Sequence, residues 1–252
     1  MEITYHKDYS RELGRDMEYK VYGHTGKPVL VFPTSNGRFF QYEDFGMIDV
    51  LRDFIDSGRI QVWTADGIDW ETFHNENGRP YDRIRRHEQY YRYVVGELVP
   101  SIQARSRNVN GGRSRGILAT GCSMGAFHSA SFFFRRPDLF DTVIALSGVY
   151  STKIFFSDYM DDVVYLNSPI DYLPRLSDPR ILDAYRRNRI ILCCGQGAWE
   201  DEMIPETRRM AEILAAKNIP AWVDFWGRDV NHDWVWWKKQ IPYFLDRTDL
   251  NN

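Results

Sequence analysis

The most constraining feature of the sequence is Gly121-Cys122-Ser123-Met124-Gly125, in which a glycine stands two residues before and two residues after a serine. An apolar run at residues 116–120 precedes it and predicts a buried strand, and the small residues Ala126, Ser129 and Ala130 favour a closely packed helix after it. A serine at a sharp strand-to-helix turn tolerates a strained backbone only where its neighbours carry little side chain. The segment therefore predicts a nucleophile elbow. A plain glycine-rich connection is the alternative, because three fixed residues recur by chance.

The elbow also predicts where negative charge would be stabilised. The helix after Ser123 begins with unpaired N–H groups and a partial positive charge, so the Met124 amide is expected to face a developing oxyanion. A second amide is expected from the loop after the first central strand, where Asn36 and Gly37 are candidates, although Asn-Gly is also an ordinary turn signal. Cys122 occupies the variable position of the motif, which predicts a packing role.

Strands and helices alternate along the chain. The periodicity predicts an N-terminal antiparallel hairpin at 3–23, strands at 28–33, 60–65, 142–146, 189–194 and 221–226, and helices at 44–58 and 91–102. This order is typical of an α/β protein with a mostly parallel central sheet and helices on both faces. Residues 150–187 fit the rhythm poorly and are interpreted as a cap-like insertion over the carboxyl edge of the sheet. Without a linker or repeat, residues 1–252 are expected to form a single domain.

A serine elbow requires an acid and then a histidine later in the chain. Of the six histidines, only His232 follows a late predicted strand and opens the last helix. The acid should follow the strand at 189–194, where three carboxylates come in a row. They are Glu200, Asp201 and Glu202. Consecutive acids are also typical of a solvated helix start, and spacing alone does not choose among the three.

Several side chains are candidates for substrate contacts. They are Phe39, Phe40, Trp199 and Trp234 as pocket walls, and His74 in a loop after a strand, where an ordinary loop histidine is the alternative. His87 falls in a segment that predicts a surface position, and His128 is expected to point away from Ser123.

Composition narrows the classes of function. With 32 basic and 35 acidic residues the net charge is −3, which does not favour nucleic-acid binding. No apolar run is long enough to span a membrane, and the N-terminus has no signal-peptide pattern, so a cytoplasmic protein is expected. The three cysteines lack metal-ligand spacing, Gly195-Gln196-Gly197 lacks the third glycine of a dinucleotide fingerprint, and no phosphate loop occurs. Neither a metal nor another cofactor is expected.

Four motifs carry a family resemblance. They are the elbow with Ala126, Glu97-Leu98-Val99-Pro100, Arg136-Pro137-Asp138-Leu139-Phe140, and His232-Asp233-Trp234-Val235-Trp236-Trp237. At these residues the chain resembles the putative esterase family of α/β-hydrolases, an esterase D-like group that includes S-formylglutathione hydrolases, feruloyl esterases and mycolyltransferases. The resemblance spans most of the chain and implies an α/β-hydrolase fold.

The resemblance also implies roles for single residues. Ser123 corresponds to the nucleophile and His232 to the base. The family often has Gly-x-x-Asp after the strand, whereas the loop here is longer, and counting back from the helix at 207–211 implies that the acid is Asp201. Val230-Asn231-His232 stands where the family has Gly-Gly-His, so the local turn is expected to differ.

Together these features predict a serine carboxylesterase that hydrolyses small-molecule esters through an acyl-enzyme on Ser123. A homo-oligomer is compatible with this hypothesis. One alternative is an acyltransferase on the same fold, in which an alcohol replaces water. The other is a catalytically silent binding protein that uses the cleft of the fold.

Overall fold

Eight strands form one sheet in the order β1-β2-β4-β3-β5-β6-β7-β8 in the computed structural model, which describes residues 1–113 and 116–250. The strands are β1 (Ile3–Ser10), β2 (Arg15–Tyr22), β3 (Lys27–Phe32), β4 (Ile60–Ala65), β5 (Ile117–Cys122), β6 (Phe140–Leu146), β7 (Arg189–Cys194) and β8 (Trp222–Phe225). β1 and β2 pair antiparallel, and β2 pairs antiparallel with β4. All pairs from β4 through β3 to β8 are parallel. The predicted parallel sheet with an antiparallel hairpin at its edge is confirmed.

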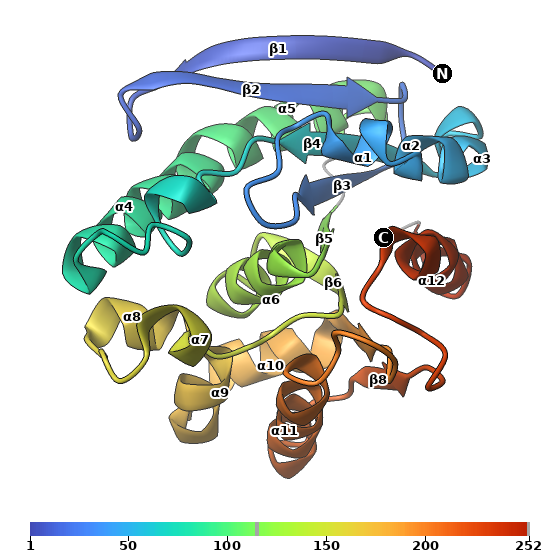
Figure 1. Ribbon diagram of the computed structural model, residues 1–252. Coiled ribbons are helices and arrows are strands. Elements are labelled where there is room, and N and C mark those ends of the chain that lie inside the picture. The colour runs from blue at the N-terminus through green and yellow to red at the C-terminus, as the bar shows by residue number, and fades with distance from the viewer. Residues whose placement is uncertain (114–115, 251–252) are drawn as a thin grey trace.

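Helices cover both faces of this sheet, as Figure 1 shows. They are α1 (Gln41–Asp44), α2 (Met47–Val50), α3 (Arg52–Asp56), η1 (Asp69–Glu71), α4 (Pro80–Tyr93), η2 (Val94–Leu98), α5 (Val99–Val109), α6 (Met124–Arg135), α7 (Lys153–Phe156), α8 (Asp162–Leu166), α9 (Pro169–Tyr172), η3 (Leu173–Arg175), α10 (Pro179–Arg187), α11 (Met203–Ala216) and α12 (Trp234–Asp246). Helices α1, α2, α3 and α12 pack on one face, and α4, α5, α6, α10 and α11 pack on the other.

Two hydrophobic clusters follow from the alternation of side chains along the strands. In β3, Leu30 and Phe32 belong to the cluster under α5, α6 and α11, whereas Val29 and Val31 belong to the cluster under α2 and α12. Successive side chains of a strand point to opposite faces, so a strand that is apolar at every position is buried on both. The central strands therefore form a rigid platform whose carboxyl ends carry the loops described below.

The two long predicted helices are divided. The segment expected as one helix at 44–58 forms α1, α2 and α3, because Gly46 adopts a left-handed φ of 71° between the first two. The helix predicted over 91–102 lies within the continuous run α4–η2–α5, where η2 is a π-helical turn just before Pro100. Proline has no N–H to donate to the preceding turn, which is consistent with a widened turn at this point.

The segment between β6 and β7 consists of short helices, α7 to α10 with η3. Helix α8 contacts α4, and α9 contacts α6 and α11. Tyr150, Leu173 and Tyr185 are completely buried, so the segment is anchored by its own apolar side chains. A cap function for residues 150–187 stays a prediction. None of the helices in the described part of the chain has the length and apolarity needed to cross a membrane.

Candidate active site

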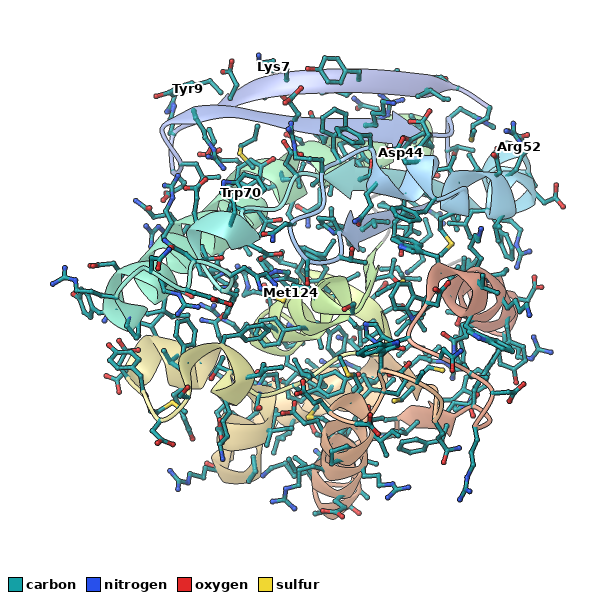
Figure 2. All side chains as sticks on the ribbon, viewed as in Figure 1. Lys7, Tyr9, Asp44, Arg52, Trp70 and Met124 are labelled. Carbon is teal, nitrogen blue, oxygen red and sulfur yellow. The ribbon has the colours of Figure 1, made fainter. Side chains whose placement is uncertain are left out.

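Ser123 lies at a tight turn between β5 and α6, with φ 56° and ψ −121°. This is a strained conformation for a residue with a side chain. A Cβ at position 121 would lie 2.4 Å from the carbonyl carbon of Gly125, and a Cβ at position 125 would lie 2.2 Å from the Phe32 carbonyl oxygen. Only glycine permits both approaches. Met124, the first residue of α6, is labelled near the centre of the molecule in Figure 2.

The imidazole of His232 meets this serine from the loop between β8 and α12. Its Nε2 lies 2.8 Å from Ser123 Oγ, although the two residues are 109 positions apart in the sequence. The His232 backbone N–H donates to the Ala198 carbonyl at 3.0 Å, and Ala198 N–H donates to Asn231 Oδ1 at 2.8 Å. These bonds tie the loop after β7 to the loop after β8. Asn231, which stands where the family has the second glycine of Gly-Gly-His, thus has a structural role: its side chain links the two loops.

The carboxylate beside His232 belongs to Glu200. Its Oε2 lies 3.5 Å from His232 Nδ1. Glu200 is completely buried, whereas the neighbouring Asp201 and Glu202 are exposed. Trp199 adopts a left-handed φ of 68°, which turns the chain so that the next side chain enters the interior. The structure thus places Glu200 beside His232, and not Asp201, which was expected from counting back from the helix.

The loop after β3 brings a second set of amides to the site. Gln41 Oε1 accepts from the Thr34 N–H at 2.8 Å, and Gly37 N–H donates to the Thr34 carbonyl at 2.9 Å. The Gly37 amide is therefore used within the turn, contrary to the expectation that it would face an oxyanion. Asn36 is exposed with a left-handed φ of 55°, and Thr34 and Ser35 are the residues of this loop that line the cleft beside Ser123.

A small cleft of about 220 Å³ opens over the serine. Its walls are Thr34, Ser35, Ser123, His232, Asp233, Trp234 and Trp237. Trp234 is one of these walls, and Phe45 stacks on it with ring centroids 4.5 Å apart. His74 reaches the rim, where its Nε2 lies 3.1 Å from Ser35 Oγ.

The other aromatic candidates do not line this cleft. Phe39 is buried, and its backbone N–H donates to Asp66. Phe40 is exposed at the start of α1. Trp199 is 81% exposed beside Glu200, so it stands in solvent next to the site rather than forming a pocket wall.

Two buried groups near the elbow were not expected from the sequence. His128 Nε2 lies 2.8 Å from Asp69 Oδ1, and His87 stacks on the His128 ring. His87 is buried and not at the surface, and desolvation together with the His128 charge lowers its pKa to about 3.

Burial raises the pKa of the Cys122 thiol to about 12, which agrees with the packing role predicted for this residue.

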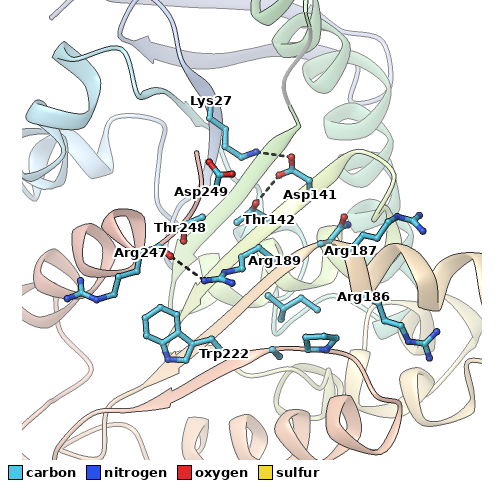
Figure 3. A pocket seen from close by; sticks show the side chains of 14 residues that line it. Lys27, Asp141, Thr142, Arg186, Arg187, Arg189, Trp222, Arg247, Thr248 and Asp249 are labelled. Carbon is cyan, nitrogen blue, oxygen red and sulfur yellow. Dashed lines mark hydrogen bonds and ion pairs between the residues drawn. The ribbon is translucent and has the colours of Figure 1, made fainter. Parts of the chain in front are cut away.

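A larger cavity lies away from Ser123, at the amino ends of the parallel strands (Figure 3). Its volume is about 680 Å³, and charged residues such as Lys27, Asp141 and Arg189 line it. The described residues around it include no serine, cysteine or histidine. In the described ranges 1–113 and 116–250, no three His, Cys, Asp or Glu side chains are grouped to hold a metal ion.

The sequence model of the family described as "Putative esterase" matches residues 10–247. The chain belongs to this family. The resemblance inferred from the four motifs is thereby confirmed, and the family is one of esterases and other serine hydrolases. No curated protein matches the sequence.

Solved structures with the same fold cover nearly the whole chain. A ferulic acid esterase is 18% identical, with a TM-score of 0.73 and coverage of 98% of this chain and 97% of that one. An S-formylglutathione hydrolase from Agrobacterium tumefaciens is 14% identical, with a TM-score of 0.68 and coverage of 97% and 95%. A fluorophosphonate-binding serine hydrolase from Staphylococcus aureus, FphF, is 16% identical, with a TM-score of 0.62 and coverage of 98% and 97%. These likenesses establish the α/β-hydrolase fold predicted from the sequence.

Proposed function

We propose that this member of the esterase family is a serine carboxylesterase that acts through a Ser123–His232–Glu200 triad. The observation that carries the proposal is the 2.8 Å contact between Ser123 Oγ and His232 Nε2 at the strained turn. A hydroxyl in this position can pass its proton to the imidazole as it attacks an ester carbonyl. Glu200 accepts from Nδ1–H, which leaves Nε2 free to act as the base.

The tetrahedral intermediate carries a negative oxygen that needs donors. Met124 N–H is not used in the ladder of α6, since the first amides of a helix have no partner within it. The Ser35 amide of the loop after β3 is proposed as the second donor, because Ser35 lines the cleft while the Thr34 and Gly37 amides are already bonded. Collapse of the intermediate expels the alcohol, with its proton supplied by His232, and leaves an acyl group on Ser123. Water then attacks the acyl carbonyl while His232 takes its proton, and His232 returns that proton to Ser123 Oγ as the bond to the acyl group breaks and the acid leaves.

The names of the structurally similar proteins support ester hydrolysis as the reaction, but they do not identify the ester. The ferulic acid esterase and the S-formylglutathione hydrolase have different acyl groups in their names, and both share less than a fifth of their residues with this chain. The substrate is therefore proposed only as a carboxylic ester or thioester small enough at its reacting end for the 220 Å³ cleft.

The test uses a fluorophosphonate probe and p-nitrophenyl acetate. The probe should form one adduct, located on Ser123 by peptide mass spectrometry, and Ser123→Ala should abolish both the adduct and the hydrolysis. The expected loss in kcat is about 10⁶-fold, as for the removal of the nucleophile from other triads. Ser129→Ala, on the same helix, is a matched control that should label normally, because the Ser129 hydroxyl is buried and donates to the Ala126 carbonyl. An adduct elsewhere, or turnover by pure Ser123→Ala protein, would refute the proposal.

A further inference from the structure

Ser147, the first residue after β6, has an unusual backbone and an unusual partner. Its φ is 56°, a left-handed value that a serine rarely adopts. Its N–H donates to the Cys193 carbonyl at 2.7 Å, which holds this conformation against the end of β7. The hydroxyl is completely buried and lies 2.5 Å from Glu200 Oε1. A strained, buried side chain directed at a carboxylate is an observation from which a functional role can be inferred.

The hydroxyl of Ser147 is itself held in place. The indole Nε1–H of Trp237, on α12, donates to Ser147 Oγ at 3.0 Å. An oxygen that accepts from the indole directs its own proton elsewhere, and the Glu200 carboxylate is the acceptor at hydrogen-bond distance. The Trp237 ring also packs edge-on against the His232 ring, with centroids 4.9 Å apart. The indole thus contacts the imidazole directly and reaches the carboxylate through Ser147.

The two oxygens of Glu200 have different surroundings. Oε1 accepts from the Ser147 hydroxyl and, at 3.3 Å, from the Gly195 N–H. Oε2 faces His232 Nδ1 at 3.5 Å and the Cys194 thiol at 3.4 Å. Burial raises the pKa of the Cys194 thiol, so the thiol keeps its proton. Donors to Oε1 fix the plane of the carboxylate and leave Oε2 for the histidine.

We propose that Ser147 is a positioning residue, whose hydroxyl, oriented by the Trp237 indole, holds Glu200 so that Oε2 faces His232. The inference rests on the proposed function of Ser123, His232 and Glu200 and adds to it the residues that set the carboxylate. A buried carboxylate without enough donors is costly, and a hydroxyl donor stabilises its ionised form. Ser147 therefore holds the Glu200 carboxylate in the orientation in which Oε2 faces His232 Nδ1.

Other charged groups surround this network and are unchanged by a substitution at position 147. Glu206 and Arg208 come from α11, and Asp224 comes from β8. Glu206 provides a matched control, because its carboxylate accepts from the Ser151 hydroxyl and from the Ser151 backbone N–H. Ser151 lies four residues after Ser147 in the same loop and is also buried. Ser151→Ala thus removes the same chemical group from a carboxylate that does not touch His232.

The experiment measures the rate of fluorophosphonate labelling and kcat/KM for p-nitrophenyl acetate between pH 5 and 9 in four proteins. They are the wild type, Ser147→Ala, Trp237→Phe and Ser151→Ala. Ser147→Ala should lower both rates by about 10- to 100-fold, a scale taken from the loss of residues that orient metal-ligating side chains. Its acid limb should also move to higher pH, because the carboxylate loses a donor that favours its ionised form.

Trp237→Phe keeps a ring against His232 but removes the donor to Ser147, so a smaller loss and a shift in the same direction are expected. Ser151→Ala should stay within about twofold of the wild type with an unmoved limb. Equal rates and limbs in Ser147→Ala and the wild type would overturn the inference, as would equal losses in Ser147→Ala and Ser151→Ala. If Ser147→Ala does not fold, the limb of Trp237→Phe decides. Failure of the wild type to label at Ser123 would instead refute the proposed function.

Discussion

Replacing Glu200 with glutamine tests the acid of the proposed triad most directly. Ser147 Oγ and Gly195 N–H both donate to Oε1, so the amide oxygen of the introduced glutamine would take that position and its NH₂ group would take the place of Oε2. That NH₂ would donate to His232 Nδ1, which forces the imidazole proton onto Nε2. An Nε2 that carries a proton cannot accept the proton of Ser123. The site would keep its shape with the wrong tautomer.

The expected loss is about 10⁴ in kcat, which corresponds to about 5.5 kcal/mol of transition-state stabilisation. Asp201→Asn and Glu202→Gln serve as controls, because both carboxylates are exposed and solvent screens their effect on His232, so changes within about twofold are expected. The assay is p-nitrophenyl acetate hydrolysis at pH 7.5, with circular dichroism to verify the fold of each variant. An active Glu200→Gln protein beside an inactive Asp201→Asn protein would show that the orientation inferred for the loop after β7 is incorrect.

Three further perturbations test the packing and burial of residues around the candidate site. His87 is neutral in the fold with a pKa of about 3, so the unfolded chain binds a proton that the native state does not bind as pH falls below about 6.5. The free energy of unfolding should therefore fall by about 2.5 kcal/mol between pH 7 and 4.5, and urea denaturation of His87→Gln should lack that part of the decrease. Gly125→Ala would place its Cβ 2.2 Å from the Phe32 carbonyl oxygen and should cost about 3 kcal/mol or more, whereas Gly96→Ala, with nothing within 4 Å, should be neutral or stabilising in the same denaturation assay. The Cys122 thiol, with a pKa of about 12, should resist iodoacetamide at pH 8 in the native protein and react in guanidinium chloride, as mass spectrometry would show; rapid native alkylation would contradict its burial.

The strands were predictable because short apolar runs in the sequence indicate buried strands. β4 and β7 have the predicted bounds, 60–65 and 189–194, and the other central strands differ by a few residues at their ends. The helices were less predictable where tertiary contacts override a local pattern. Gly46 interrupts the apolar stripe of 44–58 with a left-handed turn, although the stripe itself continues at helical spacing.

Some residues of the candidate site could likewise be selected from the sequence, and others could not. Ser123 and His232 could be selected because the elbow motif and the order of strands fix their places at one edge of the sheet. The acid could not, because three carboxylates in a row differ only in the direction of their side chains. That direction depends on the left-handed turn at Trp199, a conformation that no propensity assigns to tryptophan. Ser147 carries no sequence signal, since its role depends on Trp237, 90 residues later in the chain.

The parts of the candidate site come from four neighbouring strands: Ser123 follows β5, Ser147 follows β6, Glu200 follows β7, and His232 follows β8. Contacts between residues so far apart in sequence form late, because each must first close a long loop. Reactivity of Ser123 during refolding should therefore appear only after β8 and α12 have docked, later than the helical signal. A fragment that ends before residue 222 would lack β8, α12 and His232, so we expect it not to react with the fluorophosphonate at Ser123.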